Sequence, residues 1–317
     1  MEKLYSLVGA GGYIAPRHMK AINDTGGRLV SAMDPFESVG MLDRYSQDVK
    51  YFKSFEELQF YNLHELDRKI DYFSICSPNH LHKPHIAAGL SLGANVICEK
   101  PLVLTKKDLE TLKQIEKGSA GKVYTVLQLR VHEAIKALKK KLAANNSSKL
   151  DVDLCYMTSR GPWYHETWKA NERSSGGLPT NIGIHFFDML MWLFGDVEKS
   201  ELHIAREDIF GGYIELEHAR VRWVLSIDQK NLPRHAKEKG MTTYRSITIE
   251  GEEIEFSGGF TDLHTEVYRD ILNGNGYGLD DAAPAVILAE KIRHQSATGL
   301  NQNSHPIFNE HRSTSKG

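Results

Sequence analysis

The first 127 residues alternate short apolar runs with longer amphipathic segments, and this alternation constrains the fold more than any other feature of the chain. Buried strands are predicted at Lys3–Gly9, Leu29–Met33, Val49–Phe52, Asp71–Cys76, Asn95–Glu99 and Lys122–Leu127. Helices are predicted between them, at Pro16–Ile22, Glu37–Gln47, Ser54–Glu65, Leu81–Leu92 and Thr105–Lys117. Repeated β-α units of this length predict an α/β fold with a doubly wound parallel sheet.

The pattern changes after about residue 122, where longer strands follow one another. They are predicted at Lys149–Ser159, Lys199–Arg206, Tyr213–Glu217, Arg220–Asp228, Tyr244–Glu250 and Glu253–Ser257, with a hairpin turn at Glu250-Gly251-Glu252. We therefore expect a first domain of residues 1–121 and a second of residues 122–317, an α+β domain with a mostly antiparallel open sheet. Apolar residues alternate along Arg220–Asp228, so one face of this sheet can meet solvent or a second subunit, and we expect a homo-oligomer, a dimer or a tetramer.

Composition narrows the functional class. The net charge is −2, which provides no global field for nucleic acid or a membrane surface. The three cysteines, Cys76, Cys98 and Cys155, lie in apolar runs and are expected to be reduced, buried thiols. No apolar stretch is long enough to span a bilayer, and no signal-peptide pattern is present at the N-terminus. These features predict a cytoplasmic protein without nucleic-acid or membrane partners.

A glycine-rich turn joins the first predicted strand to the first helix. Glycines allow a sharp turn and a close approach to a pyrophosphate, which the helix N-terminus then attracts. The spacing departs from G-x-G-x-x-G, with Gly9, Gly12 and Ala15 as the small residues, and Tyr13 and Ile14 lie between them. Strand, glycine turn and helix together predict the dinucleotide-binding site of a Rossmann domain.

Asp34 follows the second predicted strand, about 20 residues after the glycines. An acid at this place is expected to bind the ribose 2′-hydroxyl and to repel a 2′-phosphate, so NAD is favoured over NADP as the cofactor. The alternative is a turn or helix-capping role for Asp34, since Pro35 follows it.

Polar motifs follow two further strands at the same edge of the sheet, where ligands bind in open α/β folds. They supply the candidate cofactor contacts Ser77, Pro78, Asn79, His82, Glu99 and Lys100. Pro101 ends the strand, so Lys100 is either a solvated strand terminus or a group aimed at the ligand. His80, His82 and His85 have no acidic or cysteine partner nearby, and we therefore expect no metal.

Two stretches of the second half carry further candidate residues. A helix predicted to begin near Thr180 places Asn181, His185 and Asp188 on one face, where Asp188 can orient the imidazole of His185. The alternative is a half-buried structural histidine. Upstream, an aromatic and basic run can stack on a base or sugar and neutralise phosphate or carboxylate, unless it is a tryptophan-anchored structural loop. Its members are Arg160, Trp163, Tyr164, Trp168, Lys169 and Arg173.

In these motifs the chain resembles the glucose-fructose oxidoreductase / inositol dehydrogenase (Gfo/Idh/MocA) family. The shared motifs are the glycine turn with His18, S-P-N-H-x-H at Ser77, E-K-P at Glu99 and G-G-x-x-x-N-x-G-x-H-x-x-D at Gly176. Within the family it is similar to the UDP-N-acetyl-2-amino-2-deoxyglucuronate dehydrogenases of O-antigen synthesis, the WlbA/WbpB group. That similarity lies in the motifs G-x-x-G-Y-I-A-P-R-H, W-Y-x-x-x-W-K, N-I-G-I-H-F-F-D and F-T-D-L-H-T-x-V-Y. Asn181 departs from the wider family, in which many members carry a catalytic aspartate.

The resemblance implies NAD-dependent oxidation of the C3 hydroxyl of UDP-N-acetylglucosaminuronate to a 3-keto sugar. Lys100 is then the base or the donor that stabilises the forming alkoxide, with His185, held by Asp188, as its partner or the alternate base. Glu99 is expected to orient Lys100 or the cofactor's carboxamide. Arg17, Arg160, Lys169 and Arg173 are the expected counter-charges for the anionic UDP-sugar. Relatives reoxidise NADH with 2-oxoglutarate. The alternatives are another sugar or inositol dehydrogenase, an NAD-dependent glycoside hydrolase and a non-catalytic NAD sensor.

Overall fold

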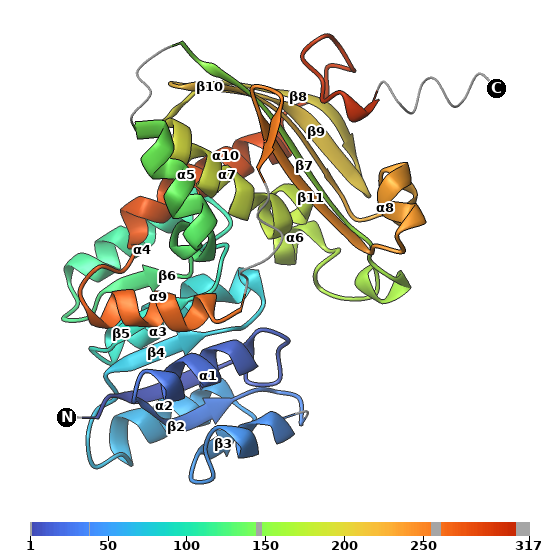
Figure 1. Cartoon of the computed structure of the whole chain (residues 1–317). Helices are drawn as coiled ribbons and strands as arrows, with labels where there is room; N and C mark the ends of the chain where they lie inside the picture. The colour runs from blue at the N-terminus through green and yellow to red at the C-terminus, as the bar shows by residue number, and fades with distance from the viewer. Residues whose placement is uncertain (1, 38, 144–147, 255–260, 309–317) are drawn as a thin grey trace. The chain divides into compact units, whose positions relative to one another are not determined.

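The computed structural model describes residues 2–37, 39–143, 148–254 and 261–308, and its contacts divide the chain into two compact units (Figure 1). The first unit combines Met1–Val131 with Thr261–Val286, and the second combines His132–Phe260 with Ile287–Gly317. No helix in the described part of the chain combines the length and apolar character that crossing a membrane requires.

A parallel sheet of six strands in the order β3-β2-β1-β4-β5-β6 forms the centre of the first unit. Its strands are β1 (Leu4–Val8), β2 (Arg28–Met33), β3 (Lys50–Phe52), β4 (Tyr72–Ile75), β5 (Asn95–Cys98) and β6 (Val123–Thr125). The helices are α1 (Ala15–Asp24), α2 (Phe55–His64), α3 (His82–Ser91), α4 (Lys106–Lys117) and α9 (Leu263–Leu272). β1 and β4 are buried along their whole length, as strands covered on both faces must be. The predicted doubly wound α/β fold is confirmed.

Two features of this unit differ from the expectation. The helix predicted at Glu37–Gln47 is wrong: the structure has only a short 3₁₀ helix, Gly40–Arg44, of which Leu42 alone is buried, so no amphipathic face stabilises a longer helix. The contacts also assign β6 and α9 to the first unit, although the sequence-based division gave both segments to the second domain. The boundary at residue 121 itself stays a prediction.

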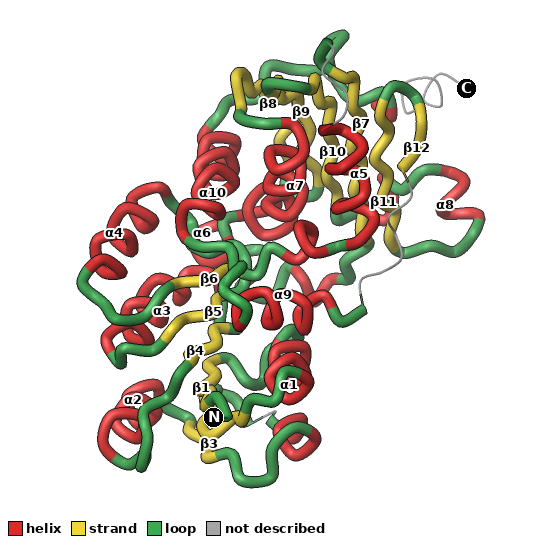
Figure 2. The backbone as a smooth tube through the Cα atoms, turned by 60° about the vertical axis from the view of Figure 1, so that its left-hand side comes forward, coloured by secondary structure: helices red, strands yellow, loops and turns green. Residues whose placement is uncertain are grey.

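The second unit contains a mostly antiparallel sheet in the order β12-β11-β7-β10-β9-β8, as predicted (Figure 2). Its strands are β7 (Leu150–Thr158), β8 (Val197–Arg206), β9 (Ile209–Leu216), β10 (Ala219–Ser226), β11 (Thr243–Ile249) and β12 (Glu252–Ile254). Among the described strand pairs of this second sheet, only β7–β10 is parallel. Glu250 and Gly251 both have positive φ, of 50° and 80°, which confirms the hairpin turn between β11 and β12.

Both faces of the second half of β10, from Trp223 to Ser226, are buried. On one face Trp223 packs edge-on against Phe187 of α7 (Ile184–Phe194), with ring centroids 5.3 Å apart. On the other face Val224 belongs to an apolar cluster with Ile307 and Phe308, which lie close to the C-terminus. The C-terminal segment therefore covers part of the sheet face that the sequence left open. The remaining helices are α5 (Glu133–Ala143), α6 (Glu172–Ser175) and α8 (Arg234–Glu238), and α10 (Leu279–His294) begins in the first unit and ends in the second.

Candidate active site

The glycine turn is packed too closely for any residue larger than glycine at its first position. Gly9 has φ +86°, and a Cβ there would lie 2.6 Å from the carbonyl carbon of Cys76. The N–H of Gly11 donates to Oδ2 of Asp34 at 2.9 Å, which ties the turn to the end of β2. The side chain of Ile14, the N-cap of α1, does not cap the helix, and the first-turn N–H groups of Ala15 and Arg17 donate to the backbone oxygens of Gly12 and Ile14. These features fit a dinucleotide.

Asp34 also accepts the N–H of Phe36 at 2.9 Å, so both of its carboxylate oxygens bind backbone groups. The turn role that the sequence left open is therefore real, and ribose binding by the buried Asp34 stays a prediction. Tyr13 is 82% exposed, and the guanidinium of the exposed Arg17 lies 6.0 Å from the centre of its ring.

The segments that follow β4 and β5 are joined by a histidine. His82 is fully buried, with Nδ1 2.7 Å from the carbonyl oxygen of Pro101 and Nε2 2.9 Å from that of Ser77. Ser77 also contacts Nδ1 of His85 at 2.8 Å through its hydroxyl, and the buried Asn79 begins a 3₁₀ turn after Pro78. The two polar motifs thus meet, as predicted from their positions at one sheet edge. A cofactor contact by His82 itself stays a prediction.

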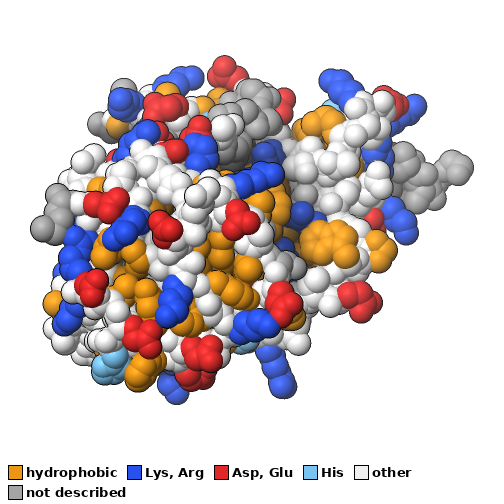
Figure 3. Space-filling view, turned by 90° about the horizontal axis from the view of Figure 1, so that it is seen from below, with side chains coloured by type: hydrophobic (Ala, Val, Ile, Leu, Met, Phe, Trp, Pro, Cys, Tyr) orange, Lys and Arg blue, Asp and Glu red, His pale blue; other side chains and the backbone are white. Residues whose placement is uncertain are grey.

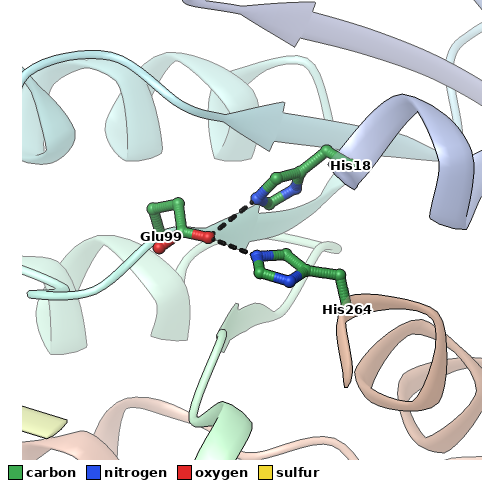
Figure 4. A group of neighbouring side chains, drawn as sticks. All are labelled: His18, Glu99 and His264. Atoms are coloured by element: carbon green, nitrogen blue, oxygen red, sulfur yellow. Dashed lines mark hydrogen bonds and ion pairs between the residues drawn. The ribbon is translucent and has the colours of Figure 1, made fainter. Parts of the chain in front are cut away.

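Glu99 lies between two buried histidines (Figure 4). Its Oε1 accepts from Nε2 of His18 at 3.0 Å and from Nε2 of His264 at 2.8 Å. Its Oε2 accepts the backbone N–H of Lys100 at 3.2 Å. His264 and Tyr268, four residues apart on α9, both contact His18 through their rings. The sequence did not predict that His18 and His264 both bind Glu99, and the E-K-P motif was the only local signal of this site.

The ionisation of this group follows from its donors. Burial raises the pKa of Glu99, but the ring N–H groups of His18 and His264 outweigh burial and hold that pKa well below its usual value. Burial lowers the pKa of His18, so its ring is neutral. Lys100 is half-buried directly after Glu99, and the Lys100–Pro101 peptide bond is cis. A fixed carboxylate therefore adjoins the predicted base.

The aromatic and basic run of the second unit forms a turn from Pro162 to Tyr164 and the loop that follows it. Trp163 is 49% exposed, and the ammonium of Lys169 lies 5.4 Å from the centre of its ring. Burial, followed by the positive charge of Arg160, lowers the pKa of Lys169. The buried hydroxyl of Tyr164 accepts a hydrogen bond from the side-chain amide of Asn181 at 3.3 Å. Burial raises the pKa of Tyr164. Trp168 is half-buried, whereas Arg160 and Arg173 are exposed.

The helix predicted from Thr180 begins as a π-helical turn, Pro179–Gly183, and continues as α7. Asn181 lies in this turn, so the four-residue spacing to His185 does not have the α-helical geometry that the prediction assumed. A π-helical turn contains an extra residue and shifts the helical periodicity locally, and the α-helical spacing assumed from the sequence did not include it. His185 is half-buried and Asp188 is buried, both on α7 and three residues apart, as predicted.

Two family models match the chain. Residues 3–127 match the NAD-binding Rossmann fold of the Gfo/Idh/MocA oxidoreductase family. Residues 149–231 match the C-terminal alpha/beta domain of the same family. Glucose-6-phosphate 3-dehydrogenase of Bacillus subtilis is 26% identical over 199 residues, 61% of this chain and 54% of that protein. The chain thus spans about half the length of this curated relative.

Solved structures match over almost the whole chain. The WlbA (WbpB) dehydrogenase of Thermus thermophilus, in complex with NAD and alpha-ketoglutarate, is 48% identical with a TM-score of 0.93. The match covers 96% of this chain and 99% of that one. The same enzyme in complex with NAD and UDP-GlcNAcA matches over the same shares, with 48% identity and a TM-score of 0.92. The expected resemblance is confirmed, and the chain belongs to the Gfo/Idh/MocA oxidoreductase family, with NAD as its cofactor.

Proposed function

We propose that this chain oxidises the C3 hydroxyl of UDP-N-acetylglucosaminuronate to the 3-keto sugar, with NAD as the hydride acceptor. The observation that supports this most is the 48% identity, over 96% of the chain, to a dehydrogenase solved with NAD and UDP-GlcNAcA. The closely packed glycine turn and the charged groups of both units agree with it. A sugar nucleotide carries a diphosphate and here also a carboxylate, which makes it a polyanion.

The first unit binds the cofactor along the carboxyl edge of its sheet. The backbone of Gly9 and Gly12 and the N-terminus of α1 receive the pyrophosphate, and Asp34 receives the adenosine ribose. Further contacts come from Tyr13, Ile14, Ser77, Pro78, Asn79, Glu99 and Lys100. His82 acts through the loop, because its ring nitrogens face the carbonyl oxygens of Ser77 and Pro101.

Lys100 takes the proton of the C3 hydroxyl, or donates to the oxygen as its charge develops. NAD, when bound, supplies the acceptor for the C3 hydride. His185 is the partner or the alternate base, and Asp188 holds its imidazole. With Asn181 in place of the aspartate of many relatives, no acid at that position can share this work.

The basic loop of the second unit recognises the anionic substrate. Trp163 and Lys169 present a ring face and a cation side by side, which suits a uridine or sugar flanked by phosphate. Lys169 has no carboxylate partner among the described residues, and Arg160 lies near enough to lower its pKa. Two neighbouring cations without an acid favour a bound anion. The remaining substrate contacts are Tyr164, Trp168, Asn181, Arg173 and Arg17.

NADH is reoxidised in place by 2-oxoglutarate, which accepts the hydride at its keto carbon and a proton at its oxygen to give 2-hydroxyglutarate. The Thermus thermophilus enzyme was solved with alpha-ketoglutarate. We place the chain in lipopolysaccharide O-antigen sugar synthesis in the cytoplasm, as a homo-oligomer, a dimer or tetramer through the second sheet. The buried free thiols of all three cysteines are consistent with a reducing compartment.

Absorbance of NADH after mixing the NAD-loaded protein with UDP-N-acetylglucosaminuronate tests the proposal. A dehydrogenase gives a single-turnover signal without added oxidant, and 2-oxoglutarate then removes the signal. A glycoside hydrolase releases sugar without net NADH, and a sensor does neither. A signal with free sugars or inositols but not with the UDP-sugar would refute the substrate and leave the family's reaction intact.

A further inference from the structure

The buried carboxylate of Glu99 lies after one strand and draws its two histidine partners from two separate helices. β5 ends at Cys98, directly before Glu99, α1 supplies His18 and α9 supplies His264. Among the described residues, these two imidazoles are the only ionisable side chains that pair with Glu99. We call His18, Glu99 and His264 the carboxylate clamp.

The hydrogen bonds around the clamp all donate in one direction, toward the carboxylate of Glu99. Because Oε1 of Glu99 accepts, both histidines donate from Nε2. Nδ1 of the neutral His18 must then accept from the hydroxyl of Tyr268 at 2.8 Å. The Tyr268 oxygen in turn accepts from the hydroxyl of Ser74 at 2.8 Å, and burial raises the pKa of Tyr268 well above its usual value, so it keeps its proton. The chain of donors ends on Glu99.

Glu99 of the clamp follows β5, the middle strand of β4, β5 and β6. This half of the sheet is the one expected to bind the nicotinamide. In a doubly wound dinucleotide fold each half of the sheet binds one mononucleotide, across the point where the strand order reverses. Here the glycine turn and Asp34 belong to the β1–β3 half, which leaves β4, β5 and β6 for the second half. Glu99 lies at the carboxyl end of β5, next to Lys100.

We propose that the carboxylate clamp is a fixed anion that favours the cationic nicotinamide of NAD⁺ over the neutral ring of NADH. A charge held in a low-dielectric site acts on a neighbouring charge far more strongly than the same charge in water. The proposal rests on NAD binding by this family and is independent of the sugar substrate. The role proposed for Glu99 differs from that of Lys100, because Glu99 affects the affinity for the cofactor and takes no part in proton transfer.

A metal ion is the competing explanation. The three ligand atoms of the clamp lie within 4.8 Å of one another, the only such group among the described residues, and two histidines with one carboxylate can bind zinc. Yet both imidazole–carboxylate distances are those of hydrogen bonds, which a metal would replace by displacing both ring protons. The metal content of the purified protein distinguishes the two explanations.

The test compares the dissociation constants of NAD⁺ and NADH, measured by calorimetry, in the wild type and in Glu99→Gln. The substitution keeps the shape and removes the charge. We expect the ratio of the NAD⁺ constant to the NADH constant to rise about tenfold, mainly through weaker NAD⁺ binding. Glu110→Gln makes the same charge change on the exposed face of α4 and is expected to leave the ratio unchanged. Equal weakening of both cofactors in Glu99→Gln would overturn the proposal and indicate a purely structural role.

A second variant tests whether the charge of Glu99 sets the NAD⁺ preference if Glu99→Gln does not fold. His264→Leu removes one donor, so burial raises the pKa of Glu99 and the anion is lost as the pH falls. As the pH is lowered, the NAD⁺ preference should then decline in this variant at a higher pH than in the wild type. A constant ratio in the variant, or one metal ion per chain in protein purified without chelator, would overturn the proposal.

Other titratable groups face Glu99 besides His264. They are His18, His82, Cys76, Cys98, Tyr268 and Lys100. Burial lowers the pKa of both histidines and raises the pKa of both thiols and of the phenol, so each of these five groups is biased toward its neutral form. Lys100 is common to the wild type and to each variant.

Discussion

Removing one hydroxyl, in Tyr268→Phe, should destabilise the first unit by about 2–3 kcal/mol. Tyr268 is fully buried, and its hydroxyl bonds both Nδ1 of His18 and the hydroxyl of Ser74, each at 2.8 Å. Phenylalanine fills the same space, so no cavity term is added. The cost is that of leaving two buried polar atoms without partners, at about 1–3 kcal/mol for each, reduced where the neighbours adjust.

Urea unfolding followed by tyrosine fluorescence and circular dichroism measures this difference, and the chain supplies a matched control. Tyr5 is also fully buried in the first unit, with its ring stacked 6.0 Å from that of Tyr268. Its hydroxyl lies near that of Thr25, with geometry too poor for a full hydrogen bond, and it meets no other partner among the described residues. Tyr5→Phe should therefore change stability by less than about 0.5 kcal/mol or raise it. Equal losses in the two variants would show that packing, and not the hydrogen-bond chain to Glu99, determines the cost.

The remaining predictions concern turnover and pH. Lys100→Ala and His185→Ala should each keep NAD binding and lower turnover by at least about a hundredfold, measured by calorimetry and NADH absorbance, and full activity in either variant would refute its assignment. Burial lowers the pKa of His85 and His305 to about 4. The unfolded chain therefore binds protons on these rings first, so stability should be complete above about pH 6.5 and decline toward about pH 4. His85→Gln should reduce this decline in urea titrations at successive pH values, and an unchanged slope would contradict the assignment.

The sequence allowed the parallel sheet to be predicted because each strand carries its own local signal. A buried run such as Tyr72–Ile75 is apolar on both faces, and its ends carry turn residues. Capping is equally local: Ser54 accepts from the N–H of Glu57, and Thr105 from that of Asp108, each three residues further along the chain. Where local signals were weak, as at Glu37–Gln47, or the periodicity was altered by one residue, as at Asn181, the prediction failed or needed correction.

The features that the sequence could not predict depend on contacts between segments that are far apart in the chain. The two bonds that hold Glu99 join residues 81 and 165 positions apart, and neither partner has a pattern that names the other. His18 and His264 meet at Glu99 because α1 packs against α9, a contact that exists only in the folded chain. The burial of the second sheet face by Ile307 and Phe308 belongs to the same class.

These contacts change the meaning of the E-K-P motif. From the sequence, Lys100 was the chemical residue and Glu99 its accessory, at a strand end that Pro101 closed. In the structure Glu99 has the more elaborate surroundings, with two imidazoles and the N–H of Lys100 as donors. Burying a carboxylate costs several kcal/mol unless hydrogen-bond donors offset that penalty. The fold brings α9, which begins at Leu263, to the end of β5, and so it stabilises the charge of Glu99 there. Measured affinities for NAD⁺ and NADH in Glu99→Gln would show whether the cofactor is what that charge acts on.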